Sequence, residues 1–315
     1  MTITRCLAST FSLYDGLTEQ RIEMSSSCLW RTQPVSGSFT IFKRWLPGLI
    51  QLSEKLIISS KLFNFYARVF SIDNDFKAGE FLLDSSESIY SLGSKISEGQ
   101  NYFRKFTILP GVSYNQIIDH GIKVGLINDV DAFPSELEIG EGLFYPDTYF
   151  FLKGDSLSKL LLESQRKWKL ITDELWKIRR KELPYQSLKE AVTLASIIEK
   201  EGSEKEMIAG VFINRLNTGM KLQSDPTVIY ALGSNFDGDI KKKDLRLDNP
   251  YNTYRYKGLP PGPISTVSED SLKAALNPLK TDFLYFVSMG NGFHKFSKTL
   301  SEHNEAVLKY QINGR

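Results

Sequence analysis

Two glutamates, Glu199 and Glu201, stand at the end of an apolar segment that the sequence predicts to be a helix. A capping box predicts where the helix begins, with Ser187 as N-cap and Glu190 three residues later, and Gly202 predicts where it ends. At about 3.6 residues per turn, Glu199 continues a stripe that is apolar throughout, formed by Leu188, Val192 and Ala195. Glu201 continues a stripe that begins with Glu190. We therefore expect Glu199 to lie against an apolar surface and Glu201 to face away from it.

A carboxyl group on an apolar surface has a specific chemical use. Burial disfavours the charged form, so such a group keeps its proton closer to neutral pH. A glutamic acid that is protonated near neutral pH can act as a general acid toward a leaving oxygen. Glu199 is therefore the candidate catalytic acid. The alternative is that both glutamates form a solvated helix end and pair with Lys200 or Lys205.

Residues that suit a sugar ligand follow this helix along the chain. Apolar sugar faces stack on aromatic rings, and sugar hydroxyls form hydrogen bonds with amides. The candidate substrate-binding residues are Gln223, Asp225, Tyr230, Asn252, Tyr254, Pro261 and His294. Structural alternatives stay open, because Asp225 precedes Pro226 and could cap a helix, His294 could be structural in a strand, and loop 258–264 could only turn the chain.

The charge balance does not indicate a nucleic-acid partner. The 315-residue chain has 39 Lys and Arg against 37 Asp and Glu, a net charge of +2, so a polar and weakly charged partner is expected. Cys6 and Cys28 are the only cysteines, and no HxxxH or CxxC spacing exists. We therefore expect no metal site.

The sequence predicts an α+β protein of two folded parts. A variable extension is expected at 1–40 and an N-terminal region at 41–155, with a small module of alternating strands and helices at about 76–124. A long charged helix at 156–183 is expected to link this region to a domain at 184–315, which carries every candidate residue above. The elements expected in the module are strands at 79–83 and 102–109 and helices at 85–97 and 113–124.

No stretch of the sequence is long and apolar enough to be expected to span a bilayer. The nearest candidate, 56–72, contains Lys61 and Arg68 and is predicted to be an amphipathic helix.

Seven ordered motifs resemble those of the endolytic murein transglycosylases, the YceG-like family. They are 194–201 (Leu-Ala-Ser-Ile-Ile-Glu-Lys-Glu), 211–216 (Val-Phe-Ile-Asn-Arg-Leu), 222–230, 251–254, 258–264, 271–278 and 284–287, the last followed by His294, Phe296, His303 and Asn304. Segment 141–149 (Glu-Gly-Leu-Phe-Tyr-Pro-Asp-Thr-Tyr) looks like part of the same family, and 76–124 resembles its LysM-like peptidoglycan-binding region. The resemblance covers roughly 76–312.

This resemblance implies a bacterial envelope enzyme that cuts inside nascent peptidoglycan strands, terminates their elongation and works near the cell-wall synthesis machinery. It implies a location at the inner membrane, with one N-terminal transmembrane helix and the catalytic part facing the periplasm. The sequence departs from the family there, because no spanning helix is visible. The resemblance places the catalytic glutamate on Glu199 and implies no metal or organic cofactor.

The reaction that the resemblance implies is non-hydrolytic cleavage between N-acetylmuramic acid and N-acetylglucosamine. Glu199 would protonate the glycosidic oxygen and then, as carboxylate, accept the proton of the muramic C6 hydroxyl, which closes on C1 and leaves a 1,6-anhydro end. Two alternatives remain. One is a peptidoglycan hydrolase in which Asp225 activates water, and the other is a catalytically silent peptidoglycan-binding protein.

Overall fold

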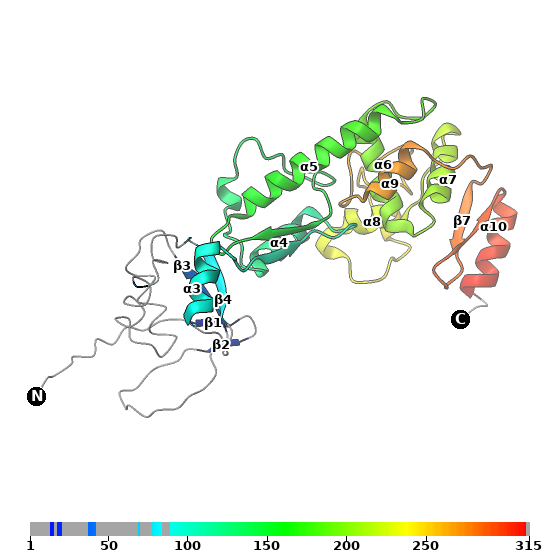
Figure 1. Cartoon of the computed structure of the whole chain (residues 1–315). Helices are drawn as coiled ribbons and strands as arrows, with labels where there is room; N and C mark the ends of the chain where they lie inside the picture. Colours follow the sequence, from blue (N-terminus) through cyan, green and yellow to red (C-terminus); the bar gives the residue numbers. More distant parts are fainter. Residues whose placement is uncertain are drawn as a thin grey trace, which may run out of the picture. The chain divides into compact units, whose positions relative to one another are not determined.

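The computed structural model describes residues 89–312 without a gap (Figure 1). Before them it describes the short strands 13–15, 18–20, 37–41 and 79–83 and the single residues 69 and 77. The chain divides into two compact units, Met1–Phe103 and Arg104–Arg315, and each is described by itself. Within the described part of the chain, no helix has the length and apolar content that a membrane crossing requires. Most of the expected extension, and all of the helix expected at 56–72 except residue 69, lie outside the described residues.

In the first unit, the described strands form antiparallel pairs. β1 (Leu13–Asp15) pairs with β2 (Thr18–Gln20), and β3 (Gly37–Ile41) pairs with β4 (Gly79–Leu83). α3 (Ile89–Glu98) packs on β4. The strand and helix predicted at 79–83 and 85–97 are therefore confirmed, with the described helix ending one residue later than predicted.

The second unit begins with another strand pair. β5 (Arg104–Thr107) is antiparallel to β6 (Thr148–Phe151). α4 (Tyr114–Lys123) starts at a capping box formed by Ser113 and Gln116, and a short 3-10 turn, η2 (Val130–Ala132), follows it. The buried side chains around this pair, called the sheet core below, include Phe106, Ile108, Ile117, Leu126, Leu137, Phe144, Tyr149 and Phe151.

The LysM-like module expected at about 76–124 is not confirmed. Its two strands do not share a sheet, because β4 pairs with β3 and β5 pairs with β6. The boundary between the compact units falls between them, after Phe103. Each strand finds a partner about 40 residues away along the chain, and local alternation of residue types contains no information about such a distant partner.

α5 (Leu157–Lys177) begins at the N-cap Ser156 and is the helix predicted at 156–183. Its first turns contribute Leu157, Leu160 and Leu161 to the sheet core. Its second half contributes Trp168, which is 4% exposed, to a second core formed by the helices that follow. The helix therefore packs along its length instead of only linking two parts.

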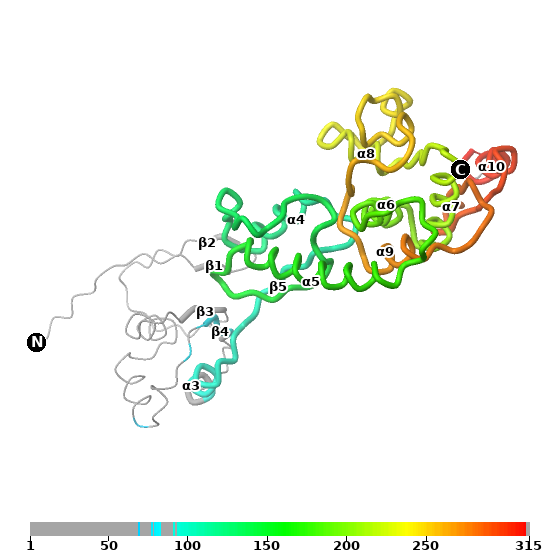
Figure 2. Tube along the Cα trace, turned by 90° about the horizontal axis from the view of Figure 1, so that it is seen from above, coloured from blue at the N-terminus to red at the C-terminus, as the bar shows by residue number. Residues whose placement is uncertain are grey.

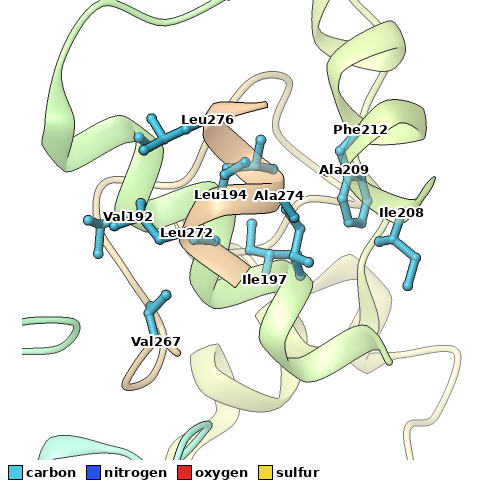
Figure 3. Close-up of a cluster of buried hydrophobic side chains, with 14 of the residues drawn as sticks. Val192, Leu194, Ile197, Ile208, Ala209, Phe212, Val267, Leu272, Ala274 and Leu276 are labelled. Carbon is cyan, nitrogen blue, oxygen red and sulfur yellow. The ribbon is translucent and has the colours of Figure 1, made fainter. Parts of the chain in front are cut away.

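The second core, called the helix core below, is built around α6 (Leu188–Glu201). α6 packs against α7 (Lys205–Asn217), α8 (Asp225–Leu232) and α9 (Glu269–Leu276), and Figure 2 shows it between α8 and α9. The predicted capping box of Ser187 and Glu190 is confirmed. Every residue of 191–198 is buried, so α6 is central. Figure 3 shows side chains of this core, among them Leu194, Ile197, Ile208, Phe212, Leu272 and Leu276.

The C-terminal part adds the predicted hairpin and a final helix. β7 (Tyr285–Ser288) is antiparallel to β8 (His294–Ser297), and α10 (Leu300–Val307) leads into a π-helical turn, η5 (Leu308–Ile312). Two short 3-10 turns, η3 (Gly233–Asn235) and η4 (Asp244–Arg246), lie in the connection from α8 to α9.

Hydrogen bonds join the region before α5 to the helices after it. The Thr266 N–H donates to Val112 O at 2.8 Å, and the Gly111 N–H donates to Thr266 O at 3.1 Å. The Tyr145 hydroxyl donates to Glu269 Oε1 at 2.8 Å. The compact unit that carries the candidate residues therefore begins near 104, and a separate domain beginning at 184 stays a prediction.

We expect a fragment covering 184–315 to fail to fold, while 104–315 folds. The shorter fragment loses Trp168 and the rest of α5, whose removal exposes apolar surface worth several kcal/mol, comparable to the stability of a small domain. Thermal unfolding of both fragments, followed by circular dichroism, checks this. A cooperative transition of 184–315 at the temperature of 104–315 would show that the boundary at 104 is wrong.

Candidate active site

Hydrogen-bond donors surround Glu199 in the last turn of α6. Its Oε2 accepts from the Ser268 N–H at 3.0 Å, the Ser268 hydroxyl at 2.5 Å and the Ser271 hydroxyl at 2.6 Å. The Lys205 ammonium lies 3.1 Å from Oε1 and 3.2 Å from Oε2. Lys205 belongs to α7, Ser271 belongs to α9 and Ser268 is the N-cap of α9. Glu199 therefore ties three helices together at one point.

These donors decide the charge of Glu199. Burial by itself would raise its pKa, but the hydrogen bonds from Ser268 and Ser271 and the charge of Lys205 outweigh burial and hold the pKa below its usual value. These donors contradict the prediction that an apolar surface keeps this carboxyl protonated. Of the alternative, only the pairing of Glu199 with Lys205 is present, since the Glu199 side chain is 10% exposed and does not form a solvated helix end. The apolar stripe was judged from α6 alone, whereas the donors come from α7 and α9.

Glu201 has the opposite surroundings at the same helix end. Its Oε1 accepts a hydrogen bond from the hydroxyl of Ser224, the N-cap of α8. Burial raises the pKa of Glu201 to about 7, and the charge of Asp225 adds to this effect, while the Ser224 bond and Arg215 oppose it. The prediction that Glu201 faces away from the apolar surface is therefore wrong. A carboxyl that holds its proton near neutral pH is present, two residues after the expected position.

The guanidinium of Arg215 is fixed close to Glu201 by main-chain groups. Arg215 is 6% exposed. Its Nε donates to Leu284 O at 2.6 Å and its Nη1 donates to Leu222 O at 2.7 Å. The positive charge of Arg215 lowers the pKa of Glu201, but the effect of burial is larger and the pKa stays above that of an exposed carboxyl.

The structure brings two predicted substrate-binding residues together beside Glu201. The Tyr254 hydroxyl donates to Asp225 Oδ1 at 2.6 Å. The N-cap of α8 is Ser224, whose side chain makes no capping bond. Asp225 lies in the first turn of this helix, where it pairs with Tyr254. Burial and the neighbouring Asp225 raise the pKa of Tyr254 above its usual value, so this hydroxyl stays a donor.

Gln223 leads into this cluster through a left-handed turn. Gln223 has a φ of 51°, and it is the non-glycine residue with a positive φ among the described residues. The Gln223 N–H donates to Thr253 O at 3.2 Å, and the Ser224 N–H donates to Thr253 Oγ1 at 3.0 Å. These bonds hold a conformation that costs on the order of 1 kcal/mol. The turn leaves the Gln223 side chain exposed next to the buried Ser224.

The remaining predicted binding residues are not part of the cluster formed by Gln223, Asp225 and Tyr254. Tyr230, in the last turn of α8, packs its ring 4.8 Å from that of Tyr251. Asn252 is fully buried, and its amide donates to Leu247 O at 2.9 Å, so its contacts support the structural alternative. Pro261 is exposed on the predicted loop.

His294 is held by the protein itself. The ring Nδ1 of His294 lies 3.0 Å from Glu204 Oε2, and the main-chain N–H of His294 donates to the same oxygen at 2.6 Å. The His294 side chain is 9% exposed. A Cβ on Gly202 would lie 2.8 Å from His294 Cε1, so only glycine allows the ring this close to the end of α6. These contacts favour the structural alternative for His294.

Sequence reasoning did not select Ser224 and Arg215 as site residues. A signal existed for Arg215, because it is a charged residue only two positions after the apolar helix segment 208–213. None existed for Ser224, whose role depends on how α8 packs on α6. Across the described residues, no three His, Cys, Asp or Glu side chains are grouped as metal ligands would be.

Comparison with known proteins agrees with this fold. The model of the YceG-like family matches residues 49–309. The endolytic murein transglycosylase of Bacillus subtilis is 44% identical over 173 residues, which cover 54% of this chain and 48% of that protein. The one of Streptococcus pneumoniae strain D39 is 34% identical over 187 residues and is covered over 32% of its length. The chain thus spans about half the length of the first relative and a third of the second.

A solved structure also matches. The crystal structure of a putative yceG-like protein from Listeria monocytogenes superposes with a TM-score of 0.55 at 34% identity, over 82% of this chain and 93% of that one. The fold is therefore of the α+β class, like that of this neighbour. The chain belongs to the YceG-like family.

We expect Glu201→Gln to stabilise the fold at alkaline pH. The folded pKa of about 7 lies above that of an exposed glutamate, so the wild type loses stability as the pH rises from about 4.5 through 7 and the neutral amide does not. The difference should grow over that range and then level off at roughly 1–3 kcal/mol. Urea unfolding at pH 5, 6, 7 and 8 measures it, with the exposed Glu206→Gln as matched control. An equal stability difference at every pH would show that Glu201 is ionised throughout.

Proposed function

We propose that this chain is an endolytic peptidoglycan transglycosylase and that Glu201 is its catalytic acid. The observation that carries the proposal is the carboxyl of Glu201, which burial keeps protonated near neutral pH beside the Ser224, Asp225 and Tyr254 side chains. A general acid works best when its pKa lies near the working pH. The names of the relatives from Bacillus subtilis and Streptococcus pneumoniae support the same activity.

The reaction requires one carboxyl that acts twice. Glu201 donates its proton to the oxygen that links N-acetylmuramic acid to N-acetylglucosamine, and the bond from that oxygen to muramic C1 breaks. The carboxylate then accepts the proton of the muramic C6 hydroxyl, whose oxygen closes on C1 and leaves a 1,6-anhydro end. Because the nucleophile belongs to the same sugar, its attack is intramolecular and needs no second carboxylate to activate water.

Glu199 is the alternative acid, since the family resemblance places the catalytic glutamate there. Its surroundings favour a different role. A carboxylate that accepts from Ser268, Ser271 and Lys205 has no proton to give, and it fixes the end of α6 that carries Glu201. We assign Glu199 the role of a positioning residue.

Among the predicted binding residues, Asp225, Tyr254 and Gln223 are proposed to contact the sugars next to the cleaved bond. They gather at the start of α8, and their side chains offer an acceptor, a ring and an exposed amide. The proposed partner is a peptidoglycan glycan strand, met on the outer side of the bacterial inner membrane near the cell-wall synthesis machinery.

One observation favours a second candidate, a two-carboxylate hydrolase. The charge of Asp225 raises the pKa of Glu201, so the two carboxyl groups interact. Asp225 is also not the N-cap of α8, which is Ser224. A carboxylate near the acid could activate water. Against this, the Tyr254 hydroxyl already donates to Asp225 and occupies its Oδ1.

Glu201→Gln should lower the cleavage rate by about 10²- to 10⁴-fold, because the amide keeps the shape but has no acid proton. Glu199→Gln should reduce the rate less, and chiefly together with stability, because it weakens the contacts with Lys205. Cleavage of purified glycan strands by both variants, with thermal unfolding of each, separates the two roles. A folded Glu199→Gln chain without activity beside an active Glu201→Gln chain would return the acid to Glu199.

The cut strands should carry anhydro ends and no oxygen from the solvent. Mass spectrometry after cleavage in heavy-oxygen water tests this, because the hydrolase product is heavier by one water and carries the label. Label at the new muramic end would bring forward the hydrolase with Asp225. Binding of strands without any cleavage would favour the catalytically silent protein.

A further inference from the structure

A second half-buried carboxyl, Glu141, lies outside the surroundings of Glu201. Its Oε2 accepts a hydrogen bond from the Tyr114 N–H at 2.8 Å. Its Oε1 accepts none from any residue that the structure describes. Burial raises the pKa of Glu141 to about 7, against the effect of the Tyr114 N–H. One oxygen of this carboxyl thus remains available to a ligand.

The segment after Glu141 is packed firmly against α6. A Cβ on Gly142 would lie 2.7 Å from Pro263 Cγ and 3.0 Å from Val192 Cγ1, and its φ is 72°, so glycine is required at this contact. The Trp168 indole N–H donates to Gly142 O at 2.7 Å. The position of Glu141 is therefore fixed relative to the helix that carries Glu201.

Two tyrosines share the neighbourhood of Glu141. The rings of Tyr230 and Tyr251 have centroids 4.8 Å apart, and the Tyr251 hydroxyl lies 3.3 Å from the place that a Cβ on Gly262 would take, next to Pro263. Burial raises the pKa of Tyr230 to about 12, and the charge of Glu141 contributes to the raised pKa of both tyrosines. A carboxyl oxygen and two half-buried rings are thus close together.

α8 connects this neighbourhood with Glu201. Its start, at Ser224, bonds to Glu201, and its last turn carries Tyr230. Along α6, Val192 and Glu201 are nine residues apart, about 14 Å. A small ligand at Glu201 does not cover that distance, whereas several linked sugars do.

We propose that Glu141, Tyr230 and Tyr251 form a sugar-binding subsite, several sugars away from the cleaved bond, that favours long glycan strands. The rings offer apolar faces to a sugar, and Oε1 of Glu141 meets a hydroxyl or an N-acetyl group. The proposal rests on the proposed function, because only a polysaccharide substrate reaches both Glu201 and Glu141.

Oligosaccharide length provides the test. Glu201→Gln is used as the background so that strands are not cut, and binding of an uncross-linked, peptide-free tetrasaccharide and dodecasaccharide is measured by calorimetry. Adding Glu141→Ala or Tyr251→Ala should weaken dodecasaccharide binding by roughly tenfold and leave tetrasaccharide binding unchanged. Glu141→Gln should stay within about twofold of the background, because its amide keeps an acceptor for the Tyr114 N–H and offers polar groups to the sugar.

Glu138→Ala and Tyr256→Phe are the matched controls, since both residues are exposed and lie outside the proposed subsite. Unchanged dodecasaccharide binding by folded Glu141→Ala and Tyr251→Ala chains would overturn the subsite while leaving the proposed function intact. Equal weakening for both lengths would also overturn it. The proposed function itself would be overturned by two results together. The Glu201→Gln background would bind neither oligosaccharide, and the wild-type chain would leave glycan strands uncut.

Discussion

The hydrogen bonds that Glu199 accepts at the end of α6 are the interaction on which the rest of the site depends. A buried carboxylate is costly unless donors compensate it, and here Ser268, Ser271 and Lys205 do so from two other helices. Three helices must therefore meet at one point for the charge to be tolerated. Their meeting fixes the last turn of α6, where Glu201 is held in surroundings of the opposite kind.

Two carboxyl groups that are two residues apart thus have pKa values that are shifted in opposite directions. Neighbouring elements cause the difference, since α9 brings donors to one glutamate and α8 brings a single hydroxyl and a second carboxylate to the other. Pairs of titratable groups whose environments move their pKa values apart are typical of acid–base catalysis. In the proposed function, the ionised member holds the scaffold and the other member acts on the substrate.

The sequence predicted the local features of this fold well, because local patterns determine them. The capping box of Ser187 and Glu190 and the hairpin around 290–292 are present where short-range rules place them. The predicted orientation of the two glutamates was wrong, because α6 is buried on all sides in its central part. No apolar stripe on this one helix therefore distinguishes Glu199 from Glu201. The pairing of β5 with β6 and the use of Ser224 depend on distant parts of the chain, which no window of the sequence contains.

α5 takes part in two cores at once. Its first turns are buried with β5, β6 and α4, and its Trp168 is buried with α6 and α9. Neither core can be exposed to water without removing one half of the same helix from its packing. Residues 104–312 should consequently behave as one cooperative unit, with a calorimetric enthalpy of unfolding equal to the van't Hoff enthalpy. Hydrogen exchange of the most protected amides on β5 and on α6 should then occur through the same global opening.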